Sequence, residues 1–228
     1  KILKDAGVEK ITGTGRLRDA HTVEVNERLY TTETILISTG GWPHLPDVPG
    51  IEHAITSNEA LDLKNLPERI AIVGGGYIAV EFAGIFNALG SQVTEIIRAP
   101  QILRGFDEDI RSALAQEMGK KGIKICRNCQ VQSIEKSQSA LFLHFSNGDT
   151  IEVDQIMYAT GRKPKSENIG LEKVGISLND KTAIEVDEFS RTAIDNIYAI
   201  GDVTDRISLT PVALAEGEAF VRTQFDNT

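Results

Sequence analysis

The sequence has few of the residues that mark several common classes of protein. Its 228 residues include only two cysteines, two methionines, one tryptophan and four histidines. Two cysteines are too few for a disulfide-stapled scaffold, which fits a reducing compartment such as the cytoplasm. The histidines are scattered and no nucleophile motif accompanies them, so we expect neither a metal site nor hydrolase chemistry.

Long apolar runs and excess positive charge are missing as well. No apolar run approaches the roughly 20 residues of a membrane span, and no signal-type segment opens the chain. The formal net charge of −9 argues against nucleic acid or an anionic membrane as the main partner. Hydrophobic residues make up 41% of the sequence, so a sizeable core is expected in one large domain or two small ones. Because the first residue is Lys1 rather than methionine, we expect the chain to be part of a longer one.

The strongest motif lies in residues 69–84, RIAIVGGGYIAVEFAG. A short apolar run predicts a buried strand, Gly74-x-Gly76-x-x-Ala79 follows, and a helical pattern begins at once. A dinucleotide site needs this order, because glycines allow a tight turn and close approach of the pyrophosphate, and the helix N-terminus offers free N–H groups. A glycine-rich turn with no ligand is the alternative. The predicted contacts are Gly74, Gly75, Gly76, Tyr77 and Ile78.

Two arginines indicate which coenzyme is expected. The predicted strand at residues 93–97 is followed by Arg98, and Arg104 comes after a short loop. Two guanidinium groups can fork onto the 2′-phosphate of NADPH, whereas NAD sites usually place an acid at this strand tip. Glu95 is the rival acid, but it lies inside the strand, so we expect it to point elsewhere. The sequence favours NADPH, with a solvated surface charge as the alternative for each arginine.

Three further side chains are candidates for cofactor contacts. Tyr77 and Glu81 lie four residues apart on the predicted helix and therefore share a face. Tyr77 is suited to cover a nicotinamide or flavin ring and Glu81 to pair with a cation, but both are equally explained as exposed surface residues. Asp202 ends a buried strand, where a carboxylate can accept hydrogen bonds from sugar hydroxyls. A helix cap or turn aspartate is the alternative for Asp202.

The two cysteines form a Cys-x-x-Cys, Cys126 and Cys129. Reactive pairs gain a low thiol pKa from a helix N-terminus, but this pair follows one predicted strand and precedes another. Positions three apart in an extended chain face opposite sides. We therefore expect two inert thiols rather than a redox or metal site.

Proline and glycine mark two boundaries, at residues 43–50 and 163–165. The first 41 residues read as short strands, one of them at residues 8–13, with a hairpin turn at Asn26-Glu27. Residues 167–191 read as irregular with short strands. A last helix, from Pro211 onward, is expected to have little to pack on.

Several motifs spread along the chain point to one family. They are Thr39-Gly40, Gly74 to Gly84, Arg98 with Arg104, Ala159-Thr160-Gly161-Arg162, and Gly201-Asp202 with Leu209-Thr210-Pro211-Val212-Ala213. Together they resemble the flavin-dependent pyridine nucleotide–disulfide oxidoreductases over nearly the whole chain. The arginine pair is similar to that of the NADPH-linked members that reduce glutathione disulfide.

The resemblance implies an α/β architecture in which an NADPH-binding Rossmann-like domain is inserted in a partial FAD-binding domain of three-layer β/β/α type. On that plan residues 42–162 bind NADPH, and residues 1–41 and 163–228 are two pieces of the FAD-binding domain.

The resemblance also implies roles for single residues. Tyr77 becomes the gate that NADPH displaces, and Glu81 lies near the flavin. Further residues implied at the NADPH site are Arg98, Arg104 and Gly161. Residues implied at the FAD site are Thr39, Gly40, Asp202 and Thr210.

Three parts of the family's pattern are missing from this sequence. They are the first FAD glycine motif, the Cys-x-x-x-x-Cys redox disulfide, and the C-terminal dimerisation domain with its His-Glu pair. We therefore expect a fragment of a homodimeric enzyme that reduces glutathione disulfide with NADPH through FAD and that disulfide. With no catalytic residue of its own, the isolated chain should bind NADPH without turnover. A related flavin reductase with another substrate and a stand-alone NADPH-binding module stay open.

Overall fold

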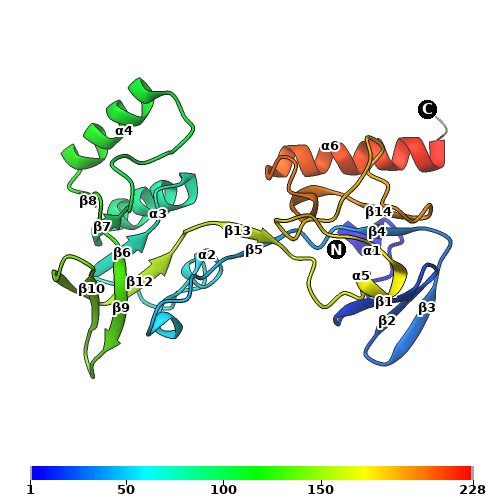
Figure 1. Ribbon diagram of the computed structural model, residues 1–228, viewed down its shortest axis with the longest axis horizontal. Helices are drawn as coiled ribbons and strands as arrows, with labels where there is room; N and C mark the ends of the chain where they lie inside the picture. The colour runs from blue at the N-terminus through cyan, green and yellow to red at the C-terminus, as the bar shows by residue number, and fades with distance from the viewer. Residues whose placement is uncertain (1, 227–228) are drawn as a thin grey trace. The chain divides into compact units, whose positions relative to one another are not determined.

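The computed structural model describes residues 2–226, and its contacts divide the chain into two units. One, here called the split unit, consists of Lys1–Trp42 and Lys163–Thr228; the other, the inserted unit, is Pro43–Arg162. Both units are α/β (Figure 1). Which nucleotide each unit binds stays a prediction.

The inserted unit is built on a four-stranded parallel sheet in the order β12-β6-β7-β8. The strands β6 (Arg69–Val73) and β7 (Gln92–Ile96) lie at its centre, flanked by β12 (Gln155–Tyr158) and the edge strand β8 (Lys124–Cys126). Four of the five residues of β6 are buried. A strand buried on both faces needs a covering layer on each side, because its apolar residues alternate between the faces.

Two helices, α3 (Tyr77–Ala88) and α4 (Glu108–Lys120), cover one face of this sheet. Ala79 and Ala83 of α3 are fully buried, so the helix lies close to the strands as their small side chains predict. Asp107 caps α4 by accepting hydrogen bonds from two backbone N–H groups, as expected for an aspartate before a helical pattern.

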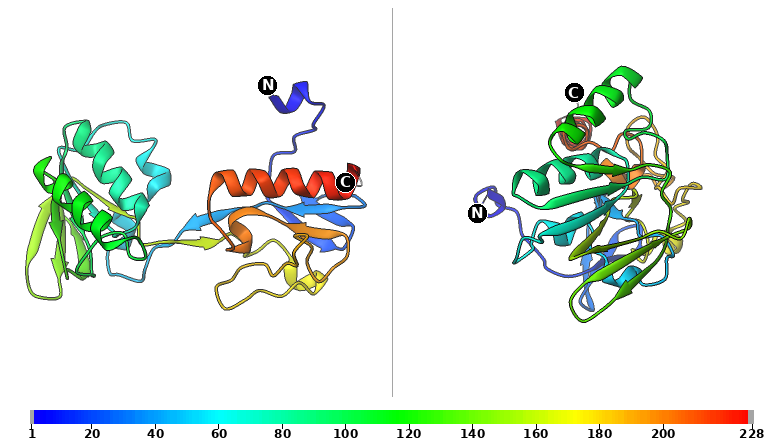
Figure 2. Two further views of the ribbon diagram at one scale, coloured as in Figure 1. Left: turned by 90° about the horizontal axis from the view of Figure 1, so that it is seen from above. Right: turned by 90° about the vertical axis from the view of Figure 1, so that its left-hand side faces the viewer.

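An antiparallel sheet covers the other face of the parallel sheet. Its strands, β9 (Val131–Lys136), β10 (Leu141–Phe145) and β11 (Thr150–Val153), pair in the order β11-β10-β9. Leu143 of β10 is fully buried between the two sheets. The inserted unit is therefore a helix–sheet–sheet sandwich (Figure 2).

The split unit repeats this layering around two parallel strands, β4 (Ile35–Ile37) and β14 (Ile197–Ala199). The helix α6 (Thr210–Val221) lies along one side of this pair in both figures. The rings of Tyr198 and Phe220 meet edge to face with centroids 5.1 Å apart. Phe220 is the only buried residue of α6, so the last helix has little to pack on, as expected from the sequence.

A three-stranded antiparallel sheet covers the other side of the split unit. It consists of β1 (Gly15–Asp19), β2 (Thr22–Val25) and β3 (Arg28–Thr31), with Leu17 buried against the parallel pair. The turn between β2 and β3 has positive φ at both Asn26 and Glu27, which confirms the predicted hairpin.

The remaining elements are short. They are α1 (Ile2–Asp5), β5 (Gly41–Pro43), η1 (Ile51–His53), α2 (Ser57–Ala60), β13 (Arg162–Pro164), α5 (Leu171–Val174), η2 (Gly201–Thr204) and η3 (Arg222–Asp226). β5 and β13 pair with each other where the chain crosses between the units. No helix within residues 2–226 is both long and apolar enough to cross a membrane.

One prediction of secondary structure is wrong, and another is right about the irregular chain but misses a short helix. Residues 8–13 form no strand, because no neighbouring strand pairs with them, and Val8 and Ile11 are 50% and 40% exposed. The stretch 167–191, expected to be irregular with short strands, contains the helix α5 between two glycines with left-handed φ. Only an isolated bridge, between Leu178 and Ile184, has β character there in addition to the bridge made by Arg191.

Candidate functional site

The turn between β6 and α3, residues 74–76, is shaped by its glycines and is called here the glycine turn. Gly74 has φ +145°, and a Cβ on it would lie 2.4 Å from the carbonyl oxygen of Ala159. A Cβ on Gly76 would meet nothing within 4 Å, so the space beside it is open. Gly76 is the N-cap residue of α3, and no side chain of residues 2–226 caps it. The first N–H groups of α3 are thus left for an anion, which is the arrangement that binds a pyrophosphate.

The segment 97–106 follows β7 and carries Arg98 and Arg104; it is called here the arginine loop. It folds back over the glycine turn, because the backbone N–H of Leu103 donates to the carbonyl oxygen of Gly75 over 2.6 Å. Leu103 is buried and has φ +52°, an unusual value for leucine. The arginine loop is therefore held against the glycine turn by its own backbone.

A side chain of α4 also holds the arginine loop. The Nε of Arg111 donates to the carbonyl oxygen of Ile102 over 2.7 Å. Its Nη1 lies 2.6 Å from the carboxylate of Glu108, which keeps the guanidinium in place. Arg111 is a positioning residue in this arrangement, since it contacts the loop backbone and not the space beside Gly76.

Arg98 and Arg104 are both exposed. Within the part of the chain that the structure describes, neither makes a hydrogen bond or ion pair. Two guanidinium groups without protein partners therefore lie on one loop against the glycine turn. That loop follows the carboxyl end of β7, where open α/β sheets bind the ribose of a dinucleotide.

The rival acid, Glu95, is fully buried inside β7. Its neighbours across the sheet are Ile72 and Ile125, so it does not lie at the tip of the strand. Neither carboxyl oxygen has a hydrogen-bond partner, and burial raises the pKa of Glu95 to about 7. A carboxyl in this position has no access to a bound ribose.

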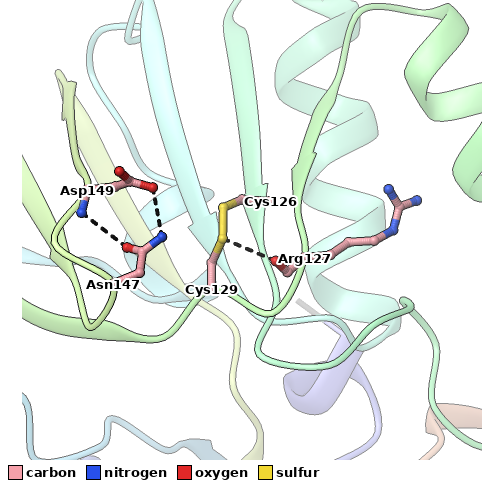
Figure 3. The surroundings of a disulfide bond; sticks show 5 residues. All are labelled: Cys126, Arg127, Cys129, Asn147 and Asp149. Atoms are coloured by element: carbon pink, nitrogen blue, oxygen red, sulfur yellow. Dashed lines mark hydrogen bonds between the residues drawn. A yellow bond between two sulfur atoms is a disulfide. The ribbon is translucent and has the colours of Figure 1, made fainter.

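The expectation of two inert thiols at Cys126 and Cys129 is wrong, because the two sulfur atoms form a disulfide (Figure 3). The chain leaves the extended conformation after Cys126, and Asn128 has φ +55°, which turns the chain back on itself. The two side chains therefore point to the same side and not to opposite sides. The signal was present in the sequence, since asparagine adopts left-handed φ more readily than most residues.

Two candidate contacts on α3 and one after β12 also belong to the inserted unit. Tyr77 and Glu81 are both exposed, and Tyr77 has 44% of its surface accessible. Gly161, with φ +135°, comes soon after the carboxyl end of β12, next to β6. Ile78 is only partly buried, and it packs against the hydrophobic core between the parallel sheet and its helices.

The four candidates in the split unit come from segments after the parallel strands β4 and β14 and from the start of α6. Thr39 Oγ1 donates to the carbonyl oxygen of Lys165 over 2.7 Å, and the carbonyl oxygen of Gly40 accepts from the N–H of Lys165 over 2.8 Å. Asp202 lies in η2, and Thr210 is the first, exposed residue of α6.

One close approach in the split unit was not expected from the sequence. A Cβ on Gly41 would lie 3.4 Å from Oδ2 of Asp202 and 3.4 Å from the carbonyl oxygen of Lys163. These are ordinary van der Waals distances, so Gly41 lies beside the Asp202 carboxylate and a small side chain would also fit there.

Among residues 2–226 no group of three or more His, Cys, Asp or Glu side chains is placed to hold a metal ion.

Layered parallel sheets with a strand, glycine turn and helix are features of dinucleotide-binding α/β folds. The family model described as "Pyridine nucleotide-disulphide oxidoreductase" matches residues 1–217, so the chain belongs to that family of flavoprotein oxidoreductases.

Curated relatives lie within the same family. A glutathione reductase of Nostoc sp. is 48% identical over 238 residues, covering 99% of this chain and 52% of the relative. A chloroplastic/mitochondrial glutathione reductase of Pisum sativum is 50% identical, covering 99% and 41%. A trypanothione reductase of Trypanosoma congolense is 46% identical, covering 98% and 48%. The chain thus spans about half the length of these relatives.

A solved structure, the HOCl-induced flavoprotein disulfide reductase RclA of Escherichia coli, superimposes with a TM-score of 0.94 at 31% sequence identity. The alignment covers 99% of this chain and 53% of that one. The sequence similarity and the shared fold therefore agree on the family.

Proposed function

We propose that the inserted unit binds NADPH and that the chain is part of an NADPH-dependent flavin reductase of glutathione disulfide. The observation that carries the coenzyme proposal is the pair of unpartnered guanidinium groups, Arg98 and Arg104, on a loop fastened to the glycine turn. A positive loop beside an uncapped helix N-terminus fits a dinucleotide with an extra phosphate on its adenosine ribose.

Each end of the coenzyme has a counterpart in the inserted unit. The pyrophosphate takes the open space beside Gly76 and accepts from the first N–H groups of α3. The 2′-phosphate takes bidentate contacts from Arg98 and Arg104. Gly161 lines the site with backbone only, and Tyr77 covers the ring that is bound beside the start of α3. NADPH supplies the hydride when it is bound; the residues named here only hold and orient it.

The split unit is proposed to bind FAD. Asp202 is suited to accept hydrogen bonds from the hydroxyls of the flavin's ribityl chain, and Gly41 lies beside its carboxylate. Thr39 and Gly40 border the same site, and Thr210 lies by the flavin ring. Glu81, which is exposed on α3 of the inserted unit, is proposed to pair with a cation.

The substrate proposal is supported by the relatives named glutathione reductase, at 45% to 50% identity. Two relatives named trypanothione reductase, at 45% and 46% identity, support a second candidate, a related disulfide substrate. We also propose that the parent enzyme is a homodimer and that it is located in the cytoplasm.

The coenzyme proposal is tested with the double variant Arg98→Gln/Arg104→Gln. Two charge-assisted contacts at roughly 1.5–3 kcal/mol each imply a loss of about 10²- to 10⁴-fold in NADPH affinity, with NADH affinity unchanged. The measurement is a calorimetric titration of each coenzyme into the chain and into the variant.

The matched control is Lys64→Gln/Lys136→Gln, which removes two positive charges at exposed positions of the same unit. It should leave both affinities within about twofold, since neither lysine belongs to the glycine turn or the arginine loop. Equal losses for NADPH and NADH in the arginine variant would reject the assignment of the 2′-phosphate to Arg98 and Arg104.

A further inference from the structure

The disulfide of Cys126 and Cys129 lies beside the arginine loop. Cys126 is the last residue of β8, the edge strand that pairs with β7, and the arginine loop begins directly after β7. The bond closes a four-residue turn, residues 126–129, called here the cysteine turn. Both the cysteine turn and the arginine loop are therefore at the carboxyl edge of the parallel sheet.

Backbone hydrogen bonds join the cysteine turn to the start of the arginine loop. The N–H of Ile97 donates to the carbonyl oxygen of Cys126 over 2.9 Å, and the N–H of Cys129 donates to the carbonyl oxygen of Ile97 over 3.0 Å. The N–H of Asn128 donates to the carbonyl oxygen of Ala99 over 3.3 Å. These bonds fix the residues on both sides of Arg98. All of them start or end in the turn that the disulfide closes.

We propose that Cys126 and Cys129 are a redox site that exchanges with small thiols and disulfides, and that its oxidation state controls how tightly the chain holds the 2′-phosphate of NADPH. The second half rests on the proposed function, since it requires Arg98 to contact that phosphate. In the oxidised chain, the disulfide limits the conformations of the cysteine turn. The backbone groups of the turn therefore keep their hydrogen bonds to Ile97 and Ala99. Reduced, the turn gains conformational freedom and the backbone of Arg98 loses part of its support.

The surroundings of the sulfur atoms allow both oxidation states. Both cysteines are only half-buried, and they contact the apolar core at its margin. Cys129 Sγ lies 3.4 Å from the carbonyl oxygen of Arg127, so a thiol at Cys129 has an acceptor in place (Figure 3). The Arg127 side chain points away from the sulfur atoms in the same view. Reduction therefore leaves no buried polar group without a partner at Cys129.

The exchange is balanced in electrons and protons. The thiolate of a small thiol attacks one sulfur of the pair, forms a mixed disulfide and releases the other cysteine as a thiolate, which takes a proton from water. A second small thiol attacks the small-molecule sulfur of the mixed disulfide and releases the second cysteine. Two electrons and two protons pass from two small thiols to the pair, and the small disulfide is the product. The reverse reaction, with a small disulfide as oxidant, restores the bond.

Glutathione and its disulfide are the couple to use, because the proposed activity converts one into the other. Abundant disulfide would oxidise the pair and tighten the NADPH site, whereas abundant thiol would reduce the pair and loosen it. The reductase would thus bind its electron donor best when its substrate accumulates. A disulfide that forms and breaks in this way is the usual kind in a reducing compartment.

The test compares the chain equilibrated with oxidised glutathione and with reduced glutathione, with free thiols counted by alkylation and mass spectrometry. NADPH and NADH affinities are then measured in each state. We expect two free thiols only in the reduced state, and an NADPH affinity about threefold to tenfold weaker there with NADH affinity unchanged. The double variants Cys126→Ser/Cys129→Ser and Cys126→Ala/Cys129→Ala should bind like the reduced chain and ignore the redox buffer.

Three results would overturn this inference: a thiol count that does not respond to the couple, equal NADPH affinities in the two states, or equal changes for NADPH and NADH. A wrong assignment of NADPH as the coenzyme would give a different result. In that case the oxidised chain would itself show no preference for NADPH over NADH.

Discussion

Glu95 provides a test of the packing of the inserted unit. Its carboxyl is fully buried in β7, and neither oxygen has a hydrogen-bond partner. Burial disfavours the charged form and raises its pKa to about 7, whereas its ordinary value is 4.5. Below pH 4.5 the group is protonated in both the folded and the unfolded chain, so its ionisation costs no stability there.

Stability is lost as the pH rises from about 4.5 to about 7, because the unfolded chain releases this proton and the folded chain retains it. Above pH 7 the loss is complete. At about 1.4 kcal/mol per pH unit, the interval between the two pKa values corresponds to about 3 kcal/mol. The substitution Glu95→Gln keeps the shape and removes the charge. Relative to the unchanged chain, it should therefore gain about 3 kcal/mol between pH 4.5 and pH 8.

Hydrogen exchange of the β6 and β7 amides at a series of pH values is the suitable assay, because it reports on the inserted unit without assuming that both units unfold together. The control is Glu68→Gln, which changes an exposed carboxyl just before β6. The control should show no pH-dependent gain. A stability difference between Glu95→Gln and the unchanged chain that stays constant from pH 4.5 to pH 8 would refute the reasoning.

Three further predictions concern the loop and the turn that form the candidate site. Replacing Arg111 by methionine removes the hydrogen bond to Ile102, so NADPH affinity should fall about threefold to tenfold while NADH affinity stays unchanged. A titration with each coenzyme measures this, and a larger loss for NADH would contradict the positioning role. Gly74→Ala should destabilise the inserted unit by more than about 2 kcal/mol in hydrogen exchange, because its Cβ would meet the Ala159 carbonyl at 2.4 Å. Gly76→Ala should leave stability within about 1 kcal/mol but abolish binding of both coenzymes, and normal binding would show that no pyrophosphate lies there.

The central βαβ unit was predictable from the sequence because its signals are local. The apolar run of β6 and the glycine turn predicted the strand and the start of α3. Gly90, with φ +105°, lies just after the C-cap residue of that helix. Asp107 gave the start of α4. Each of these signals acts within a few residues, where backbone geometry and capping decide the structure.

The failures have two physical causes, a missing partner strand and an overlooked local turn. Residues 8–13 have strand-like composition but no partner strand, and strand propensity without pairing does not make a strand. The disulfide depends on a turn at Asn128 that overrides the extended pattern of β8.

The candidate site was predictable only in part. The position of Glu95 inside its strand already set it apart from the strand tip, and the burial in the structure explains why no ribose can reach it. The fold of the arginine loop was not predictable, because Leu103 adopts left-handed φ against its own preference. The hydrogen bond from Leu103 to Gly75 and the packing of its side chain hold it there, and both are tertiary contacts.

A crystal structure of the chain with bound NADP⁺ would show whether the arginine loop selects a dinucleotide with a 2′-phosphate. We expect phosphate oxygens at about 2.7–2.9 Å from the guanidinium nitrogens of both Arg98 and Arg104. A 2′-phosphate far from both side chains, with the two guanidinium groups still unpartnered, would contradict it.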